Sequence, residues 1–264
     1  MLDLNSENFN LFRDRIINIA LLASNTIMKN IDAKIRYKSD GTPVTDADIQ
    51  SDKIVTNQIE LFSPDIPIVS EEKEIPESAS GENTHWLVDP LDGTKSFIEG
   101  GNDFVVCIAL IKKQVPIFGC IAHPPSQKVW IGGKNMGSYI KLPKLKIKKI
   151  FCRDIPAEGP TIATSRHHIG PKLKEWLEKI QYHKTVSKGS AIKFALVAEG
   201  KLDIYPRTSP TYEWDSAAGQ AIVEGSGGKV LQLNNKKLIY GRSNRLNPNF
   251  VAFGRSNWSE FLLE

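Results

Sequence analysis

Two aspartates, Asp89 and Asp92, directly follow the short apolar run at 86–88. An apolar run of this kind indicates a buried strand. Carboxylates at the end of a buried strand are costly unless a cation or hydrogen bonds compensate them. Hard oxygen ligands of this type suit Mg²⁺. Gly93 and Thr94 follow, and they could open a helix whose free N–H groups face a phosphate. The chain must therefore fold so that this strand end meets compensating groups.

Three further acidic segments add to this pair. They are 45–48 (TDAD), 70–72 (SEE) and the Trp214–Asp215 pair. Each has a purely structural explanation when taken alone, as a helix cap, a solvated loop or a turn. Thr45 with Asp48, for example, has the spacing of a capping box. Placed together at strand ends and helix starts, the acidic segments predict a multi-metal phosphate site.

Composition excludes several classes of protein. A chain of 264 residues can bury a sizeable hydrophobic core without disulfides or a structural metal to stabilise it. The net charge of +4 suits an anionic small molecule and falls short of a dedicated nucleic-acid binder. We interpret the lysine-rich run at 141–149 as a solvated edge strand, and we expect no nucleic-acid partner.

The cysteines and the apolar runs bear on the compartment. The 3 cysteines, Cys107, Cys120 and Cys152, are an odd number without a CxxC pair, which argues against a disulfide framework or structural zinc. A reducing cytoplasm fits best. We expect no signal peptide, because the polar and acidic start lacks the character of one. The longest strongly apolar run, at 104–111, is far too short for a membrane span.

The order of predicted elements suggests two subdomains. Residues 1–150 combine two long helices, at 7–30 and 45–62, with several strands. In residues 151–264 helices and strands alternate, which is typical of a layered α/β unit. We predict an N-terminal α+β subdomain with most of the metal ligands and a C-terminal α/β subdomain with Asp215 and the substrate contacts.

Four segments together resemble the inositol monophosphatase-like, lithium-sensitive phosphatase superfamily. Residues 86–97 (WLVDPLDGTKSF) match its first signature. Residues 214–219 (WDSAAG), followed by Gly227 and Gly228, match its second, and 42–48 and 70–72 fit in the right order. The resemblance spans nearly the whole chain. It implies an α+β fold, a layered α-β-α-β-α sandwich of the sugar phosphatase type.

Within the superfamily the chain most resembles the 3'(2'),5'-bisphosphate nucleotidases of the CysQ type. The supporting segments are 90–95 with Phe97, 165–168 (SRHH), 188–194 (KGSAIKF), 196–200 (LVAEG) and 205–207 (YPR). Two departures stand out. Glu213 replaces the apolar residue usual before the Trp–Asp pair, and Ser226 stands where alanine is common. Neither is a ligand position.

The resemblance assigns metal ligands by position. Glu71, Asp89 and the backbone carbonyl of Leu91 would hold a first Mg²⁺, and Asp89, Asp92 and Asp215 a second. Some family members bind a third, weaker ion near Glu71. Glu72 ranks below Glu71 as a participant.

The catalytic groups follow from the same resemblance. Asp48 and the Thr94 hydroxyl would orient or deprotonate the attacking water, with Glu71 beside them. The amides of Gly93 and Thr94 would hold the phosphate oxygens.

The resemblance also implies the substrate contacts. His168, Ser190, Lys193 and Arg207 align with positions that contact the nucleoside and 5'-phosphate of 3'-phosphoadenosine 5'-phosphate. His167 could replace His168. Lys193 and Arg207 are natural partners for a second phosphate. From spacing alone, a solvated helix lysine and a loop arginine are equally good interpretations.

The leading hypothesis is a Mg²⁺-dependent 3'-nucleotidase that releases AMP and phosphate and clears a by-product of sulfate assimilation or sulfotransfer. The first alternative is an inositol monophosphatase, fructose-1,6-bisphosphatase or histidinol-phosphatase of the same superfamily. The second is a catalytically silent nucleotide or metal sensor. The oligomeric state, monomer or homodimer, stays open.

Overall fold

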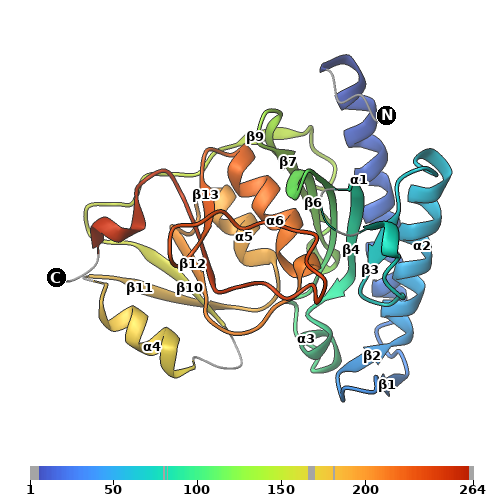
Figure 1. Cartoon of the computed structure of the whole chain (residues 1–264), viewed down its shortest axis with the longest axis horizontal. Coiled ribbons are helices and arrows are strands. Elements are labelled where there is room, and N and C mark those ends of the chain that lie inside the picture. The colour runs from blue at the N-terminus through green and yellow to red at the C-terminus, as the bar shows by residue number, and fades with distance from the viewer. Residues whose placement is uncertain (1–5, 80, 82, 166–169, 181, 262–264) are drawn as a thin grey trace.

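The computed structural model describes residues 6–79, 81, 83–165, 170–180 and 182–261, and its elements form five layers (Figure 1). Two long helices form the first layer, a large mixed sheet the second, two further helices the third, a smaller sheet the fourth, and one short helix the fifth. The layered α-β-α-β-α prediction is therefore confirmed. In layer order the helices are α1 (Ser6–Lys29), α2 (Asp46–Phe62), α5 (Ile192–Ala198), α6 (Glu213–Gly225) and α4 (Pro171–Glu178).

The large sheet contains seven strands among the described residues. Its order is β3-β4-β5-β6-β7-β8-β9, antiparallel except for the parallel pair β3–β4. The strands are β3 (Ile68–Ser70), β4 (His85–Asp92), β5 (Val105–Lys112), β6 (Val115–His123), β7 (Lys128–Gly133), β8 (Gly137–Lys141) and β9 (Lys148–Ile150). The lysine-rich run at 141–149 is not one continuous strand. Residues 142–147 lie between β8 and β9, and of this run only 148–149 belong to an edge strand, β9.

Strand β5 is apolar from Val105 to Ile111 because both of its faces are covered. Val106 and Ile108 contribute to a core with α1 and α2, whereas Val105 and Cys107 contribute to a core with α5 and α6. Alternate residues of a strand point to opposite faces, so an unbroken apolar run is what a doubly covered strand requires.

The smaller sheet has the order β11-β10-β12-β14-β13. Its strands are β10 (Thr161–Ser165), β11 (Lys184–Lys188), β12 (Ile204–Arg207), β13 (Lys229–Gln232) and β14 (Phe250–Phe253). Helix α4 packs on its outer face, where Trp176 and Leu173 join Ile162, Ile204 and Val251 in one apolar cluster.

Short elements complete the chain. Strands β1 (Ile35–Tyr37) and β2 (Pro43–Thr45) form an antiparallel pair before α2, and α3 (Thr94–Ile98) follows β4. The 3₁₀ helices are η1 (Glu77–Ala79), η2 (Pro124–Ser126) and η3 (Trp258–Phe261). Within the described part of the chain, no helix combines the length and apolar character that crossing a bilayer requires.

The predicted capping box of α2 is confirmed. The backbone N–H of Asp48 donates to Thr45 Oγ1 at 3.4 Å, and the Thr45 N–H donates to Asp48 Oδ2 at 2.8 Å. Both bonds satisfy N–H groups that a helix start otherwise leaves open. The cap also holds the Asp48 side chain in a fixed orientation.

Helix α6 packs very closely on the large sheet. A Cβ added at Gly119 of β6 would lie 2.3 Å from the Ala218 carbonyl oxygen and 2.8 Å from the Ala218 Cα. Only glycine, which has no Cβ, allows the backbone of α6 to lie this close to the backbone of β6. Because α6 also carries Asp215, this contact helps to set where that carboxylate lies.

We expect Gly119→Ala to lower the free energy of unfolding by about 1–3 kcal/mol, because the methyl group must push α6 away from the sheet. Urea denaturation measures this change. Gly170→Ala is the control, since nothing lies within 4 Å of its added Cβ. It should change stability by less than about 1 kcal/mol. Equal effects of the two substitutions would contradict the close-packing argument.

Candidate active site

The two aspartates at the end of β4 share one cavity because the strand is irregular there. Asp89 pairs with Cys107 and Asp92 with Val105, so three steps along β4 match two steps along β5. In a regular strand, residues three apart point to opposite faces, and a bulge of one residue removes that difference. Asp89 and Asp92 therefore both line a cavity of about 390 Å³.

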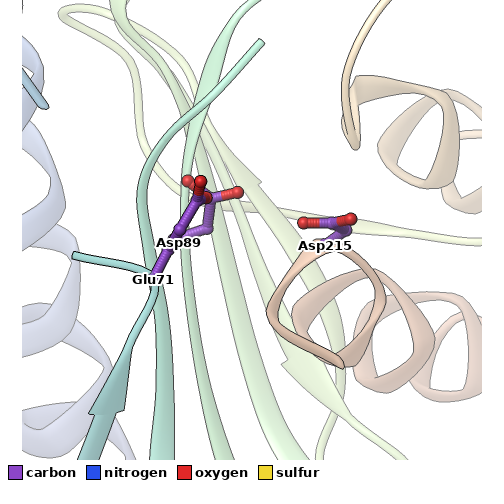
Figure 2. A group of neighbouring side chains, drawn as sticks. All are labelled: Glu71, Asp89 and Asp215. Atoms are coloured by element: carbon purple, nitrogen blue, oxygen red, sulfur yellow. The ribbon is translucent and has the colours of Figure 1, made fainter. Parts of the chain in front are cut away.

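Three carboxylates converge at this point. Glu71 follows β3, Asp89 belongs to β4, and Asp215 lies in the first turn of α6 (Figure 2). One carboxylate oxygen from each lies within 4.8 Å of the other two. The Glu71 N–H donates to the Val88 carbonyl at 3.1 Å, and the Tyr212 N–H donates to Asp215 Oδ2 at 2.8 Å. Hydrogen bonds that involve backbone N–H groups thus help to position Glu71 and Asp215.

The cluster is electrostatically strained when it holds no cation. Burial raises the pKa of Asp89 well above its usual range, and the nearby charges of Glu71 and Asp92 raise it further. Burial likewise raises the pKa of Asp215, with Asp92 and Glu71 as the next causes. A divalent cation would reverse this effect, because it favours the charged carboxylates. All-oxygen donors of this kind fit Mg²⁺.

The Asp48 and Thr94 side chains are hydrogen-bonded to each other. Thr94 Oγ1 lies 3.0 Å from Asp48 Oδ1 and 3.2 Å from the Leu91 carbonyl oxygen, and its one proton can serve either acceptor. Asp48 Oδ2 accepts from the Thr45 hydroxyl at 2.6 Å. Burial is the main cause that raises the pKa of Asp48. Thr94 lines the cavity, whereas Asp48 is not among the described residues that line it.

Gly93 shapes the turn between β4 and α3. Its φ is +103°, and an added Cβ would lie 2.6 Å from the Asp103 carbonyl oxygen. Glycine is therefore required on both conformational and steric grounds. Gly93 and Thr94 line the cavity beside Leu91.

Lys193 lines the same cavity. It is only 2% exposed, so the interpretation as a solvated helix lysine is wrong. Lys193 Nζ donates to the carbonyls of Ser190 and Lys188 at 2.6 and 3.1 Å and lies 4.9 Å from the Tyr205 ring centroid. Burial lowers the pKa of Lys193 to about 7.

Ser190 and Arg207 line the cavity with Lys193. Arg207 Nη2 donates to the Pro210 carbonyl at 3.3 Å, while its Nε is buried and has no partner among the described residues. Ser165, Tyr205 and Arg207 also line a neighbouring cavity of about 530 Å³. His167 and His168 lie outside the described residues.

Two residues near the site were not predicted from the sequence. Lys38 Nζ lies 2.9 Å from Glu71 Oε1 and 2.8 Å from Glu72 Oε1. Burial by itself lowers the pKa of Lys38, but these two carboxylates raise it above its ordinary value. Burial raises the pKa of Glu72 to about 7. No sequence pattern links Lys38 to residues 71–72, since only the folded chain brings them together.

Asp103 is the second such residue. Its Oδ2 accepts from the Gly189 N–H at 2.9 Å, and its Oδ1 lies 3.4 Å from Lys188 Nζ. Asp92 Oδ2 accepts from the Ala191 N–H. Both aspartates thereby hold the loop that carries Ser190 against the end of β4.

Comparisons with known proteins agree with this geometry. The family model described as "Inositol monophosphatase family" matches residues 12–262. The 3'(2'),5'-bisphosphate nucleotidase CysQ of Buchnera aphidicola is 40% identical over 247 residues, which cover 90% of this chain and 92% of that protein. The CysQ protein of Escherichia coli strain K12 is 37% identical over 243 residues, with 90% and 97% covered.

Solved structures give the same result. The CysQ structure from Bacteroides thetaiotaomicron, titled a bacterial member of the inositol monophosphatase family, matches with a TM-score of 0.82 and 29% identity. The match covers 97% of this chain and 100% of that one. A Thermotoga maritima IMPase matches in fold, with a TM-score of 0.76, 22% identity and coverage of 92% and 91%. On the family match and this shared fold, the chain belongs to the inositol monophosphatase family.

Proposed function

We propose that this protein is a Mg²⁺-dependent 3'(2'),5'-bisphosphate nucleotidase. It hydrolyses the 3'-phosphate of 3'-phosphoadenosine 5'-phosphate and releases AMP and phosphate. The observation that carries the proposal is one cavity lined both by the carboxylates of Glu71, Asp89, Asp92 and Asp215 and by two cationic side chains, the buried Lys193 and the partly buried Arg207. The identity to named CysQ proteins, 40% and 37% in the two relatives above, supports the choice of substrate.

The metal ligands follow the family assignment. Glu71, Asp89 and the carbonyl of Leu91 would hold one Mg²⁺, and Asp89, Asp92 and Asp215 would hold a second. A third, weaker ion near Glu71 would meet Lys38, which already occupies that side of the carboxylate. When bound, Mg²⁺ stabilises negative charge on phosphate oxygens and makes water easier to deprotonate.

The attacking water loses its proton to Asp48 through Thr94. The Thr94 hydroxyl donates to Asp48 Oδ1, which leaves a lone pair on Thr94 Oγ1 directed away to accept from the water. Burial raises the pKa of Asp48, so its carboxylate is a better proton acceptor than an exposed aspartate. The amides of Gly93 and Thr94 bind the phosphate oxygens, and Glu71 helps to orient the water.

The second phosphate of the substrate is bound by Lys193 and Arg207. Arg207 has a buried Nε without a partner among the described residues, and a phosphate oxygen can supply one. A phosphate also favours the charged form of Lys193, whose pKa burial otherwise lowers to about 7. Ser190 and His168 complete the contacts to the nucleoside end.

Two broader aspects belong to the same proposal. We place the enzyme in a reducing cytoplasm, which fits the buried and unpaired Cys107, Cys120 and Cys152. We also divide the chain into subdomains at 1–150 and 151–264. The large sheet lies in the first range and the smaller sheet in the second, and Asp215 joins a cluster that otherwise comes from the first range.

Asp89→Asn should abolish most of the activity, because Asp89 contributes to both metal positions. We expect kcat to fall by about three orders of magnitude. The substitution removes a buried repelling charge, so metal-free protein should not melt earlier than the wild type. Mg²⁺ should raise the melting temperature of the wild type but not of the variant.

The matched control is Asp65→Asn, which changes an exposed aspartate away from the cavity. It should keep both the activity and the stabilisation by Mg²⁺. Wild-type melting that does not respond to Mg²⁺ would contradict the metal assignment.

Arg207→Ala and Lys193→Met test the second phosphate. For 3'-phosphoadenosine 5'-phosphate, we expect kcat/KM to fall about 100-fold for each variant, because a charge-assisted contact to phosphate is lost. For inositol 1-phosphate, the fall should stay within about fivefold. The exposed Lys236→Ala is the control and should change neither value. A wild-type enzyme that hydrolyses both substrates equally well would favour the inositol phosphatase alternative.

A further inference from the structure

A fully buried ion pair lies next to the active site without lining it. Arg245 Nη1 lies 3.0 Å from Glu213 Oε2, and the two residues are 2% and 0% exposed. The Glu213 carboxylate also accepts from the backbone N–H groups of Gly241 at 3.1 Å and Arg242 at 2.9 Å. The described residues that line the cavity do not include Glu213 or Arg245. A buried charge with this many partners fixes the groups that it joins.

The pair holds the start of α6. The Glu213 N–H donates to the Arg245 carbonyl at 2.8 Å, and the Asn247 N–H donates to the Thr211 carbonyl at 2.8 Å. Residues 245–247 therefore run antiparallel to residues 211–213. Asn247 Nδ2 also donates to the Tyr212 carbonyl at 2.5 Å. The N–H of Tyr212 in turn donates to Asp215. The hydrogen bonds between residues 211–213 and 245–247 are therefore directly connected to a carboxylate of the cluster.

The same arginine also holds the segment before β4. Arg245 Nη2 donates to the Ala79 carbonyl at 2.6 Å, and its Nη1 lies 3.5 Å from His85 Nε2. The Gly81 N–H donates to the Gly241 carbonyl at 3.1 Å. His85 is the first residue of β4, the strand that carries Asp89 and Asp92. One buried ion pair thus connects the two elements that bring Asp215 and Asp89 together.

Such a connection is needed because the carboxylates repel one another. Asp89, Asp215 and Glu71 come from separate elements, and one carboxylate oxygen from each lies within 4.8 Å of the other two. Their repulsion tends to move α6 away from β4. Mg²⁺ requires near-ideal geometry with oxygen distances of about 2.0–2.1 Å. A small displacement of α6 would therefore weaken binding of the ion.

We propose that Glu213 and Arg245 are positioning residues that set the separation between Asp215 and the carboxylates of β4, and thereby the affinity of the cluster for divalent cations. The inference rests on the proposed function only in that the cluster binds a metal.

Glu213→Gln keeps the size of the side chain and removes its charge. We expect the dissociation constant for Mn²⁺, measured by calorimetry without substrate, to rise about tenfold. In turnover assays, more Mg²⁺ should be needed for half-maximal activity, and excess Mg²⁺ should restore most of kcat. KM for the nucleotide should stay within about twofold, because Lys193 and Arg207 lie on other elements. Unchanged Mn²⁺ affinity in folded Glu213→Gln would overturn the inference.

A double variant separates positioning from stability. Glu213→Gln leaves Arg245 buried and unpaired, which is destabilising, whereas Glu213→Gln with Arg245→Met removes both charges. We expect the melting temperature to recover in the double variant while Mn²⁺ affinity stays weak. Recovery of both together would show a merely structural role. If the single variant fails to fold, the double variant provides the same test.

Arg242→Ala is the matched control, since Arg242 Nη1 lies 3.5 Å from the same carboxylate and the side chain is 22% exposed. Its Mn²⁺ affinity should change by less than about twofold. A wild-type protein that binds no Mn²⁺ would overturn the proposed metal site, and this inference with it. A wild-type protein that binds Mn²⁺ no more tightly than Glu213→Gln would overturn this inference alone.

Discussion

Mutual repulsion among clustered carboxylates, of which Asp89 is buried and Glu71 and Asp215 are partly buried, is the constraint around which the site is built. Asp89, Asp215 and Glu71 lie within 4.8 Å of one another, and burial and proximity together raise the pKa of the two aspartates. Such a cluster destabilises the folded chain unless a cation occupies it or the surrounding elements resist the repulsion. The bulge in β4, the backbone bond of Glu71 to β4 and the braced start of α6 all hold the charges in place.

Helix α6 connects this site to the core. It lies between the two sheets and presses against Gly119 of β6 so closely that an added methyl group would overlap the Ala218 backbone. Its first turn carries Asp215, and the Glu213–Arg245 pair ties that turn to the segment before β4. Core packing and site geometry therefore depend on one element, and a shift of α6 would disturb both.

The substrate end depends on the same strand as the metal end. Asp92, a predicted metal ligand, also accepts from the Ala191 N–H, and Asp103 holds Gly189. These contacts hold the loop with Ser190, which precedes α5 and Lys193, close to Asp92 and Asp103. Residues proposed for the metal and for the second phosphate are therefore joined through one loop.

Much of this was predictable from the sequence, where the signal is local. The capping box of Thr45 and Asp48 and the apolar strand that leads into Asp89 each depend on residues close in the chain, whereas the layered fold was implied by the resemblance of four separate segments to a known family. Contacts across the chain were harder to foresee. The sequence could not decide whether Lys193 is solvated or buried, and it contained no sign that Lys38 meets Glu71 or that Glu213 pairs with Arg245.

The sequence by itself determined the chemical inventory: carboxylates at strand and helix ends, a glycine where the backbone turns with positive φ, and the motifs that indicate the family. Periodicity, caps and turns are short-range properties, so a linear pattern records them. Only the tertiary structure decided which of these groups meet. Convergence of Glu71, Asp89 and Asp215 requires the large sheet and α6 to pack together. That packing is set by close contacts and buried ion pairs between residues far apart in the chain, which no local pattern encodes.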